Sequence, residues 1–494
     1  MPLRRHLRPC LLTLAAASLL GSCNYLAEKG PLQAVVIGPA LKMTDPDTGH
    51  PDTASQSLLS ATAQGLVSFD GDGQIEPGLA ERWVVTNDAL SYIFRIRDAA
   101  WTNGEPVTTA QVAALLRSHI AATSRNRYAR EIPGVESIRP MTAQVVEIRL
   151  KQPLPHLLEV LAQPEMALLR KGRGWGPMTA KQDGEALLLQ ARKLGGAEGE
   201  TAIVPDMIEP VRITARPAAQ ALARYVNGQA DVVLGGRFTD YPLARAAAID
   251  NNRLFVDPAE GMFGLVFAHD DGIAADAGVR RAISMAIRRQ RLTSSLGETR
   301  WTPLLSLRPP LEKQERAYAP AQPAYAALDA NARLLEARTI IAEATAGLEQ
   351  KPVLRIALPQ GPGADLLFAS LRADLRQAGL DAARVGERDA ADLRLVDELA
   401  PSRDPFWYLR ALSCARVPVC SSVADQTLAQ AAVSADPATK AALFREAEAL
   451  LLETAGYIPL AEPLRWSVTS PRSNALRPNP RARHPLNRLV AIPS

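Results

Sequence analysis

The chain contains few of the residues that build metal sites, and it has few long apolar runs. Its 494 residues include four cysteines and six histidines, and aromatic residues make up only 5%. The scattered histidines and cysteines do not show metal-ligand spacing, so we expect neither a metal nor another cofactor. No run of about 20 apolar residues follows the N-terminal segment, which excludes a protein with several membrane spans.

Sequence signatures of common enzyme classes are also absent. The chain has no G-x-S-x-G, no H-E-x-x-H, no Walker-type G-x-x-x-x-G-K and no strand-linked G-x-G-x-x-G motif. The adjacent acidic pairs Asp270-Asp271 and Asp397-Glu398 are typical of surface charge. We therefore assign no catalytic residue and predict that the protein is not an enzyme.

Length and composition indicate a globular chain of several domains. Hydrophobic residues make up 47% of the chain and charged residues 22%, which are ordinary values for globular proteins. One hydrophobic core rarely grows past about 250–300 residues, so we expect two to four domains.

The N-terminal residues predict export from the cytoplasm. Three arginines within the first eight residues form a positively charged start, and residues 11–20 form a ten-residue apolar stretch. That stretch is too short for a permanent membrane span. The residues therefore predict a signal peptide. A twin-arginine signal fits the residues around Arg4-Arg5 poorly.

The end of this segment predicts a lipid anchor. Leu20-Gly21-Ser22-Cys23 resembles the lipobox of bacterial lipoproteins. The resemblance implies removal of residues 1–22, lipidation of Cys23, and a mature chain bound to a membrane of the bacterial envelope in the periplasmic space. A plain secretory signal is the alternative. Asn24 is not the aspartate that retains lipoproteins in the inner membrane, which favours the outer membrane in a Gram-negative cell.

The charge of the mature chain argues against nucleic acid as a partner. Removing residues 1–22 takes away three arginines and lowers the formal charge from +4 to +1. Nucleic-acid binding needs a concentrated basic face. The basic stretch 472–488 is interleaved with prolines and predicts an extended surface segment instead.

The remaining cysteines predict one disulfide. Cys10 leaves with the signal and Cys23 takes the lipid, which leaves Cys414 and Cys420. Their spacing is not that of a C-x-x-C redox or zinc motif, and the predicted compartment is oxidising. We expect these two residues to form a local disulfide.

Hydrophobic patterning predicts an α/β protein. An apolar strand is expected at residues 34–37, a hairpin around the Asp-Gly turn within residues 68–75, and two further strands within residues 83–97. Apolar residues at helical spacing predict a helix over residues 110–122, capped by Thr108 or Thr109.

The same region resembles a known family. Residues 65–112 (GLVSFDGDGQIEPGLAERWVVTNDALSYIFRIRDAAWTNGEPVTTAQV) are similar to the signature region of the family 5 extracellular solute-binding proteins, which are receptors of ABC importers for peptides and nickel. Similar motifs follow at residues 174–178, 225–232, 279–289 and 444–460. The resemblance departs from the family at Gln64 and at Arg288, where the family has acidic residues.

The resemblance implies a two-lobe periplasmic-binding-protein fold of type II, cluster C-like, with an extra subdomain in lobe I. Lobe I would comprise residues 24–255 with the subdomain at about 62–165, and lobe II residues 256–465. Residues 466–494 would return to lobe I. The implied function is capture of a peptide-like or other small solute by a monomer, which delivers it to the ABC permease. The departures leave an alternative, a reused scaffold that senses or holds a protein partner without transport.

The resemblance also implies where the ligand binds. Peptide-binding members hold the ligand as an added strand between two segments. The corresponding residues here are His50, Asp52, Thr53, Glu398, Ala400, Arg403, Asp404 and Trp407.

The aspartate that pairs with a peptide ammonium in the family falls on Pro401, so a free peptide N-terminus lacks its partner. Asp397, Glu398 or Asp404 could substitute for it. Asp404-Pro405 also fits a helix start, and Trp407 also fits a core position.

Overall fold

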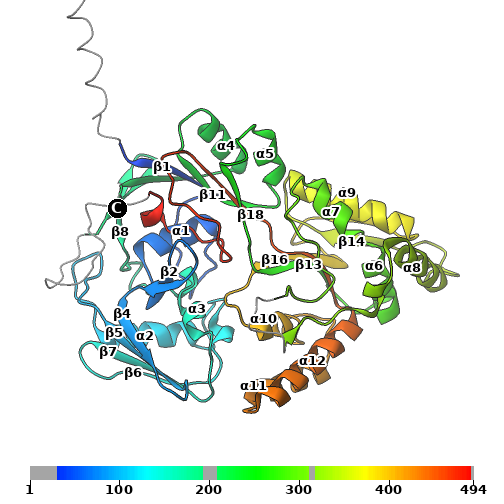
Figure 1. The fold of residues 1–494 in the computed structure, drawn as a ribbon, viewed down its shortest axis with the longest axis horizontal. Helices are drawn as coiled ribbons and strands as arrows, with labels where there is room; N and C mark the ends of the chain where they lie inside the picture. Colours follow the sequence, from blue (N-terminus) through cyan, green and yellow to red (C-terminus); the bar gives the residue numbers. More distant parts are fainter. Residues whose placement is uncertain (1–29, 193–207, 311–317, 491–494) are drawn as a thin grey trace, which may run out of the picture.

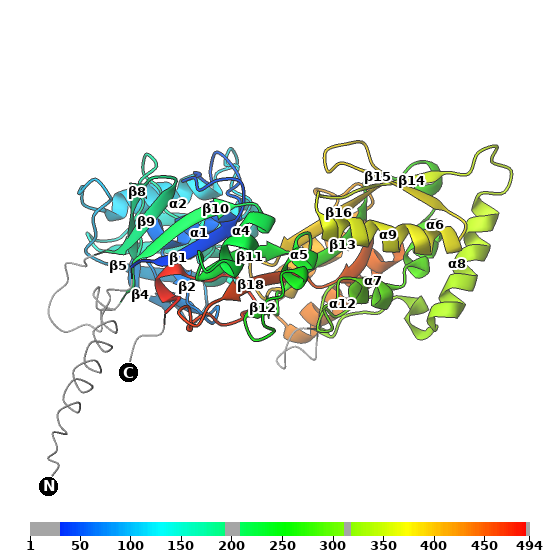
Figure 2. The same ribbon diagram turned by 90° about the horizontal axis from the view of Figure 1, so that it is seen from above.

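The structure is a computed structural model that describes residues 30–192, 208–310 and 318–490. The predicted signal peptide and Cys23 lie outside the described residues. Figures 1 and 2 show two bodies side by side, which we call lobe I and lobe II. Each lobe is built on its own β-sheet with helices packed against it, so the predicted α/β class is confirmed. No helix in the described part of the chain has the length and apolarity needed to cross a membrane.

Lobe I contains a seven-stranded sheet in the order β12-β18-β11-β1-β10-β9-β8. The central strand β1 runs parallel to β10 and β11, and the strands toward both edges are antiparallel. The expected strand at residues 34–37 is therefore the centre of the sheet. The strands are β1 Leu32–Ile37, β8 Met178–Asp183, β9 Ala186–Ala191, β10 Val211–Arg216, β11 Val232–Arg237, β12 Leu254–Asp257 and β18 Arg465–Thr469. Helices α1 Thr53–Thr62, α4 Ala218–Val226 and α5 Tyr241–Ala246 belong to the same lobe.

A subdomain of lobe I carries a second apolar cluster. The predicted hairpin is present as β2 and β3, and the predicted strands within residues 83–97 are β4 and β5. Thr108 caps α2 in a capping box with Gln111, which is why the helix starts there. The elements are β2 Val67–Phe69, β3 Ile75–Pro77, β4 Ala80–Val85, β5 Ser91–Ile96, α2 Thr109–Ile120, η1 Ala129–Glu131, β6 Val135–Pro140, β7 Val145–Leu150, α3 Leu157–Leu161 and η2 Pro164–Met166.

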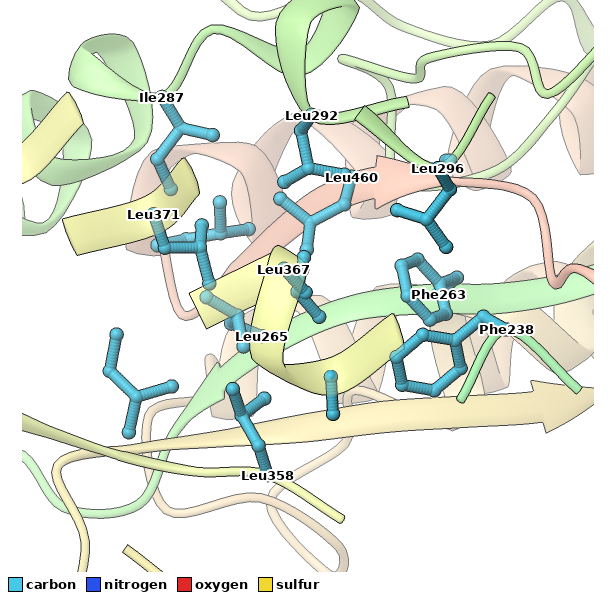
Figure 3. Packing of buried hydrophobic residues seen from close by; sticks show 14 of the residues in the cluster. Phe238, Phe263, Leu265, Ile287, Leu292, Leu296, Leu358, Leu367, Leu371 and Leu460 are labelled. Carbon is cyan, nitrogen blue, oxygen red and sulfur yellow. The ribbon is translucent and has the colours of Figure 1, made fainter. Parts of the chain in front are cut away.

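Lobe II is built on a five-stranded sheet in the order β15-β14-β16-β13-β17. Its strands are β13 Gly261–Phe267, β14 Val353–Ala357, β15 Asp381–Val385, β16 Leu393–Leu399 and β17 Tyr457–Ala461. Its helices are η4 Gly272–Ala274, α6 Ala277–Ala286, α7 Arg289–Ser295, η6 Ala324–Ala327, α8 Ala330–Ala344, α9 Pro362–Gln377, α10 Pro405–Arg410, α11 Ser422–Val433 and α12 Pro437–Thr454. Figure 3 shows the core between this sheet and α9, where Leu265 lies close to Leu367.

The apolar core of lobe II extends to the end of a lobe I strand. Phe238, which follows β11, packs edge-on against Phe263 with ring centroids 4.9 Å apart (Figure 3). Phe263 in turn contacts Trp301 at 5.2 Å. The two lobes are therefore in apolar contact at the place where strands pass from one to the other.

The chain crosses between the sheets at two neighbouring segments. The first, residues 258–260, joins β12 to β13, and the second, residues 462–464, joins β17 to β18. After β18 the chain stays beside lobe I, where residues 470–490 include η7 Leu486–Arg488. Two adjacent crossing segments can act as a hinge, because few backbone dihedrals have to change for the lobes to move apart.

Arg288 is a structural residue. It immediately precedes α7, and both its backbone N–H and its Nε donate to the carboxylate of Asp374 on α9, at 3.0 and 2.9 Å. Asp374 also accepts a hydrogen bond from Arg291. The family's acidic residue at this position is thus replaced by an arginine that pairs with the buried Asp374 carboxylate. This departure needs no change of function to explain it.

Candidate ligand-binding site

The facing surfaces of the lobes are made of loops that follow strands and helices. Lobe I contributes residues 121–131 after α2, residues 159–165 around α3 and η2, and Arg481 of the C-terminal segment. Lobe II contributes residues 397–404 at the end of β16 and the loop after α10. Polar and charged side chains dominate these loops, and many of them pair across the interface.

The predicted ligand residues of lobe I lie at the start of α1. His50 is exposed. Asp52 caps the helix by accepting a hydrogen bond from the backbone N–H of Ser55 at 2.8 Å. Thr53 begins the helix and lines a small cavity. The segment is thus fixed by helix capping and leaves the His50 side chain accessible.

Two predicted residues of lobe II contact lobe I. Glu398, whose side chain is 49% exposed, lies 3.7 Å from the guanidinium of Arg127. The backbone N–H of Arg403 donates to the Glu159 carboxylate at 2.8 Å. Ala400 is buried, and its N–H donates to the carbonyl of Glu260 at 2.9 Å. Residues 398–403 are therefore one part of lobe II that touches lobe I and the crossing segment.

The other two predicted residues have structural contacts. Asp404 caps α10 through the N–H of Phe406, so the helix-start interpretation is confirmed. Its carboxylate also pairs with Arg410 at 3.0 Å. Trp407 is 3% exposed and packs edge-on against Tyr408 in an apolar cluster. The indole of Trp407 therefore does not face the space between the lobes.

A hydrogen bond at Pro401 joins the lobes directly. The side-chain amide of Gln163 donates to the carbonyl of Pro401 at 2.7 Å, and this contact is buried. Proline has no N–H to offer in return. Gln163 was not among the predicted residues, since the two positions are 238 residues apart in the chain.

Asp397 holds the lobes together near the crossing segments. Its carboxylate accepts hydrogen bonds from Arg237 at 2.7 Å and from Arg465 at 2.8 Å. Burial alone would raise the pKa of Asp397, but the positive charges of Arg465 and Arg237 outweigh it and hold the pKa below its ordinary value. Asp397 is thus an ionised carboxylate whose partners lie on lobe I strands.

A second charged cluster lies where the C-terminal segment meets the first crossing. Arg481, which is 4% exposed, pairs with Glu159 and lies 3.8 Å from Glu260. Arg403 of lobe II also pairs with Glu260, at 3.4 Å. Burial would raise the pKa of Glu159, but a hydrogen bond from His156 and the charge of Arg481 lower it below its ordinary value.

The predicted disulfide is present in a loop that reaches across the interface. Cys414 and Cys420 are bonded, with Cα atoms 5.0 Å apart. The loop that they close contains Arg416, whose guanidinium pairs with Glu131 of lobe I. Glu131 is 3% exposed and also pairs with Arg410 at 3.3 Å. A buried carboxylate of one lobe is therefore matched by two cations of the other.

The small cavity beside α1 has room for only a few water molecules. Its volume is about 60 Å³, whereas small-molecule sites usually measure about 300–1,000 Å³. Gln56, Gln163 and Arg483 are among its polar lining residues, and all the residues that line it lie in lobe I or in the C-terminal segment. In this closed arrangement it cannot hold a peptide.

A larger and more open cavity of about 370 Å³ lies between lobe I and the disulfide loop. We call it the arginine groove, because Arg125, Arg127 and Arg130 of lobe I and Arg416 of lobe II line it. No Asp or Glu is among its lining residues. In the part of the chain that the structure describes, no group of three or more His, Cys, Asp or Glu residues could hold a metal ion.

Two hinged lobes that meet through polar loops, with a groove lined from both sides, define a two-lobe solute-binding protein. Solved structures share this two-lobe fold. Haemophilus influenzae OppA in complex with the peptide RPPGFSPFR gives a TM-score of 0.79 at 16% identity, over 94% of this chain and 99% of that chain. The murein tripeptide-binding protein MppA of Escherichia coli gives 0.79 at 18% identity, over 94% and 98%. The predicted two-lobe type II fold is confirmed.

The open form of MppA compares differently. The structure of its unliganded open form gives a TM-score of only 0.66, at 19% identity over 94% of this chain and 97% of that one. The lobes of this chain are therefore arranged less like those of the open form. The direct contacts between the lobes agree with a closed arrangement.

The chain belongs to the bacterial extracellular solute-binding proteins, family 5, whose "Middle" family model matches residues 74–186 and 207–400. Among its relatives, the glutathione-binding protein GsiB of Escherichia coli O1:K1 is 24% identical over 485 residues, covering 90% of this chain and 91% of that protein. The predicted family is thus confirmed. The chain is a solute-binding protein of an ABC importer, and the comparisons do not support the alternative of a reused scaffold. The family and its relatives are binding proteins rather than enzymes.

Proposed function

We propose that this protein captures a small, peptide-like solute between its lobes and delivers it to the permease of an ABC importer, held to the membrane by a lipid on Cys23. The contacts that support this proposal are those at Pro401 and Asp397, where the closed lobes meet through hydrogen-bonding groups. A solute that enters this interface contacts both lobes, and only such a solute can favour closure. Relatives that bind glutathione or peptides support the peptide-like class.

The solute that we propose has no free ammonium at the Pro401 end. Three carboxylates lie near enough to replace the missing family aspartate: Asp397, Glu398 and Asp404. Each of them lies within 4 Å of an arginine in the closed structure. A buried ammonium without its own carboxylate costs several kcal/mol. N-acetylated peptides or other amine-free solutes therefore fit the site better than free peptides.

A thermal-shift screen tests this function. The library contains di- to pentapeptides with free and with acetylated N-termini, opines and oligosaccharides. A solute at about 100 times its dissociation constant stabilises the protein by about 2.7 kcal/mol, a shift of several degrees. We expect acetylated or amine-free solutes to raise the melting temperature. Stabilisation by free peptides alone would show that another carboxylate holds the ammonium, and no stabilisation by any small solute would contradict the proposed function.

A further inference from the structure

Two of the four arginines that line the arginine groove carry positive charges that no described residue neutralises. For Arg125 and Arg130, no hydrogen bond or ion pair of the guanidinium occurs with any described residue. The polar neighbours are already engaged: Ser124 donates to Asp47 at 3.1 Å, and Asn126 donates to the carbonyl of Glu165 at 2.6 Å. Two cations thus line the same groove without a carboxylate partner among the described residues.

The remaining arginines connect the groove to the contacts between the lobes. Arg127 lies 3.9 Å from Glu165 and 3.7 Å from Glu398, distances too long for strong direct hydrogen bonds. Arg416 enters the groove from lobe II on the disulfide loop. The groove therefore has walls on both lobes, and Arg127 connects it to Glu398 of the proposed ligand site.

A groove with this lining selects for acidic molecules. A guanidinium presents two parallel N–H donors that match the two oxygens of a carboxylate. A ligand that bridged Arg125 or Arg130 of lobe I to Arg416 of lobe II would gain contacts only in the closed form, and so would favour closure. The volume of about 370 Å³ lies within the range of small-molecule sites.

We propose that the solute is an acidic molecule with two or more carboxylates, and that Arg125 and Arg130 bind one of these carboxylates in the arginine groove. This inference rests on the proposed function and names the chemical class of its substrate. It agrees with the state of the cleft, where Asp397 and Asp404 near Pro401 are already paired with arginines.

The test compares matched probes on the purified full chain by isothermal calorimetry. N-acetyl-Glu-Ala-Glu is the acidic probe, N-acetyl-Gln-Ala-Gln-amide is its neutral counterpart, and citrate is a small polycarboxylate. The variant carries Arg125→Gln with Arg130→Gln. The control is Arg139→Gln, an exposed arginine of β6 in the same subdomain that does not line the groove. Melting curves of the variants show whether each one folds.

We expect an acidic probe to bind at least about tenfold more tightly than the neutral one, since a hydrogen bond to a charged group contributes enough for such a factor. The double variant should lose about tenfold or more of this affinity, and the Arg139→Gln control should stay within about twofold. Raising the salt concentration to about 0.5 M should weaken binding, because the groove is open to solvent.

Three results would overturn the proposal. The first is equal binding of the acidic and neutral probes, and the second is equal affinity of the wild type and the double variant for an acidic probe. The third is that neither acidic probe binds while a neutral or cationic solute from the wider screen stabilises the protein. In each of these cases the proposed function stands whenever some solute still stabilises the chain. If no solute at all does so, the proposed function fails as well.

Discussion

Asp397 offers a direct test of how the two lobes are held together. Its carboxylate lies on β16 of lobe II and bonds Arg237 and Arg465, which stand at the ends of lobe I strands. The side chain of Asp397 is 3% exposed and that of Arg465 12%, whereas that of Arg237 is 41% exposed. The substitution Asp397→Asn keeps the shape of the side chain and removes its charge.

The expected loss of stability follows from the burial of the two arginines. Removing one partner of a buried ion pair costs about 3–5 kcal/mol, since the other charge stays buried. This value applies to Arg465, while the more exposed Arg237 adds at most about 1 kcal/mol. The asparagine oxygen still accepts one hydrogen bond. We therefore expect Asp397→Asn to lower the free energy of unfolding by about 2–4 kcal/mol.

Scanning calorimetry at pH 7 measures this effect. At about 2–4 °C per kcal/mol, the melting temperature should fall by roughly 4–16 °C. The pKa of folded Asp397 is depressed, so the advantage of the wild type is fully present above the ordinary aspartate pKa near 3.9 and disappears as the pH falls through the lower folded value. The control is Asp365→Asn, whose carboxylate is 65% exposed in its pair with Arg384; it should cost less than about 1 kcal/mol. If Asp397→Asn melted within about one degree of the wild type at pH 7, the argument for a buried pair would be refuted.

Three further predictions concern the hinge, the sheet and the disulfide loop. Burial and the charge of Glu260 raise the pKa of Glu462, so the fold favours the protonated form and loses stability as the pH rises through the raised value. Glu462→Gln should therefore melt at a higher temperature than the wild type at pH 7, and the difference in melting temperature should shrink toward pH 4.5. A difference that stays constant with pH would contradict this assignment. A Cβ on Gly236 would come within 2.1 Å of the Trp466 ring, so Gly236→Ala should lower the free energy of unfolding by about 1–3 kcal/mol in a denaturant titration, and an unchanged midpoint would show that the ring moves aside easily. Cys420→Ser opens a seven-residue loop and should lower the free energy of unfolding by about 2 kcal/mol. Reduction of the wild type should have the same effect. If a reductant destabilised the variant as much as the wild type, loss of the disulfide would not be the cause of the destabilisation.

Much of the fold could be predicted because its signals are local. The hairpin of β2 and β3 follows from an Asp-Gly turn, where the Asp70 carboxylate accepts hydrogen bonds from the N–H groups of Asp72 and Gln74. Helix α2 follows from its capping box and its apolar spacing. Each of these signals lies within about ten residues, so the chain reveals it without knowledge of the tertiary structure.

The contacts across the interface could not be predicted in the same way. Gln163 and Pro401 are 238 residues apart, and Arg237 and Asp397 are 160 residues apart. Polar residues at the ends of strands have no periodicity that would identify their partners. The sequence also does not determine the direction of a side chain next to a loop. It therefore did not show that Trp407 faces the core rather than the interface.

The arginine groove has a signal in the sequence. Three arginines lie within the six residues from Arg125 to Arg130 with no acidic residue between them. A short run of like charges is usually a solvated face, so the run alone predicts little. Its meaning depends on Arg416, which only the fold brings to the same place.

The most direct test of the account is the distance between the lobes with and without solute. In the chain that starts at Asn24, the only native cysteines are the disulfide pair, so spin labels attach only to introduced cysteines. Val84 on β4 and Val423 on α11 are exposed, on lobe I and lobe II respectively. We predict that double electron–electron resonance shows one short, narrow distance between the two spin labels when the solute that raises the melting temperature most is bound. Without that solute we predict a longer and broader distribution of distances. The same distribution in both states would contradict capture by closure of the lobes.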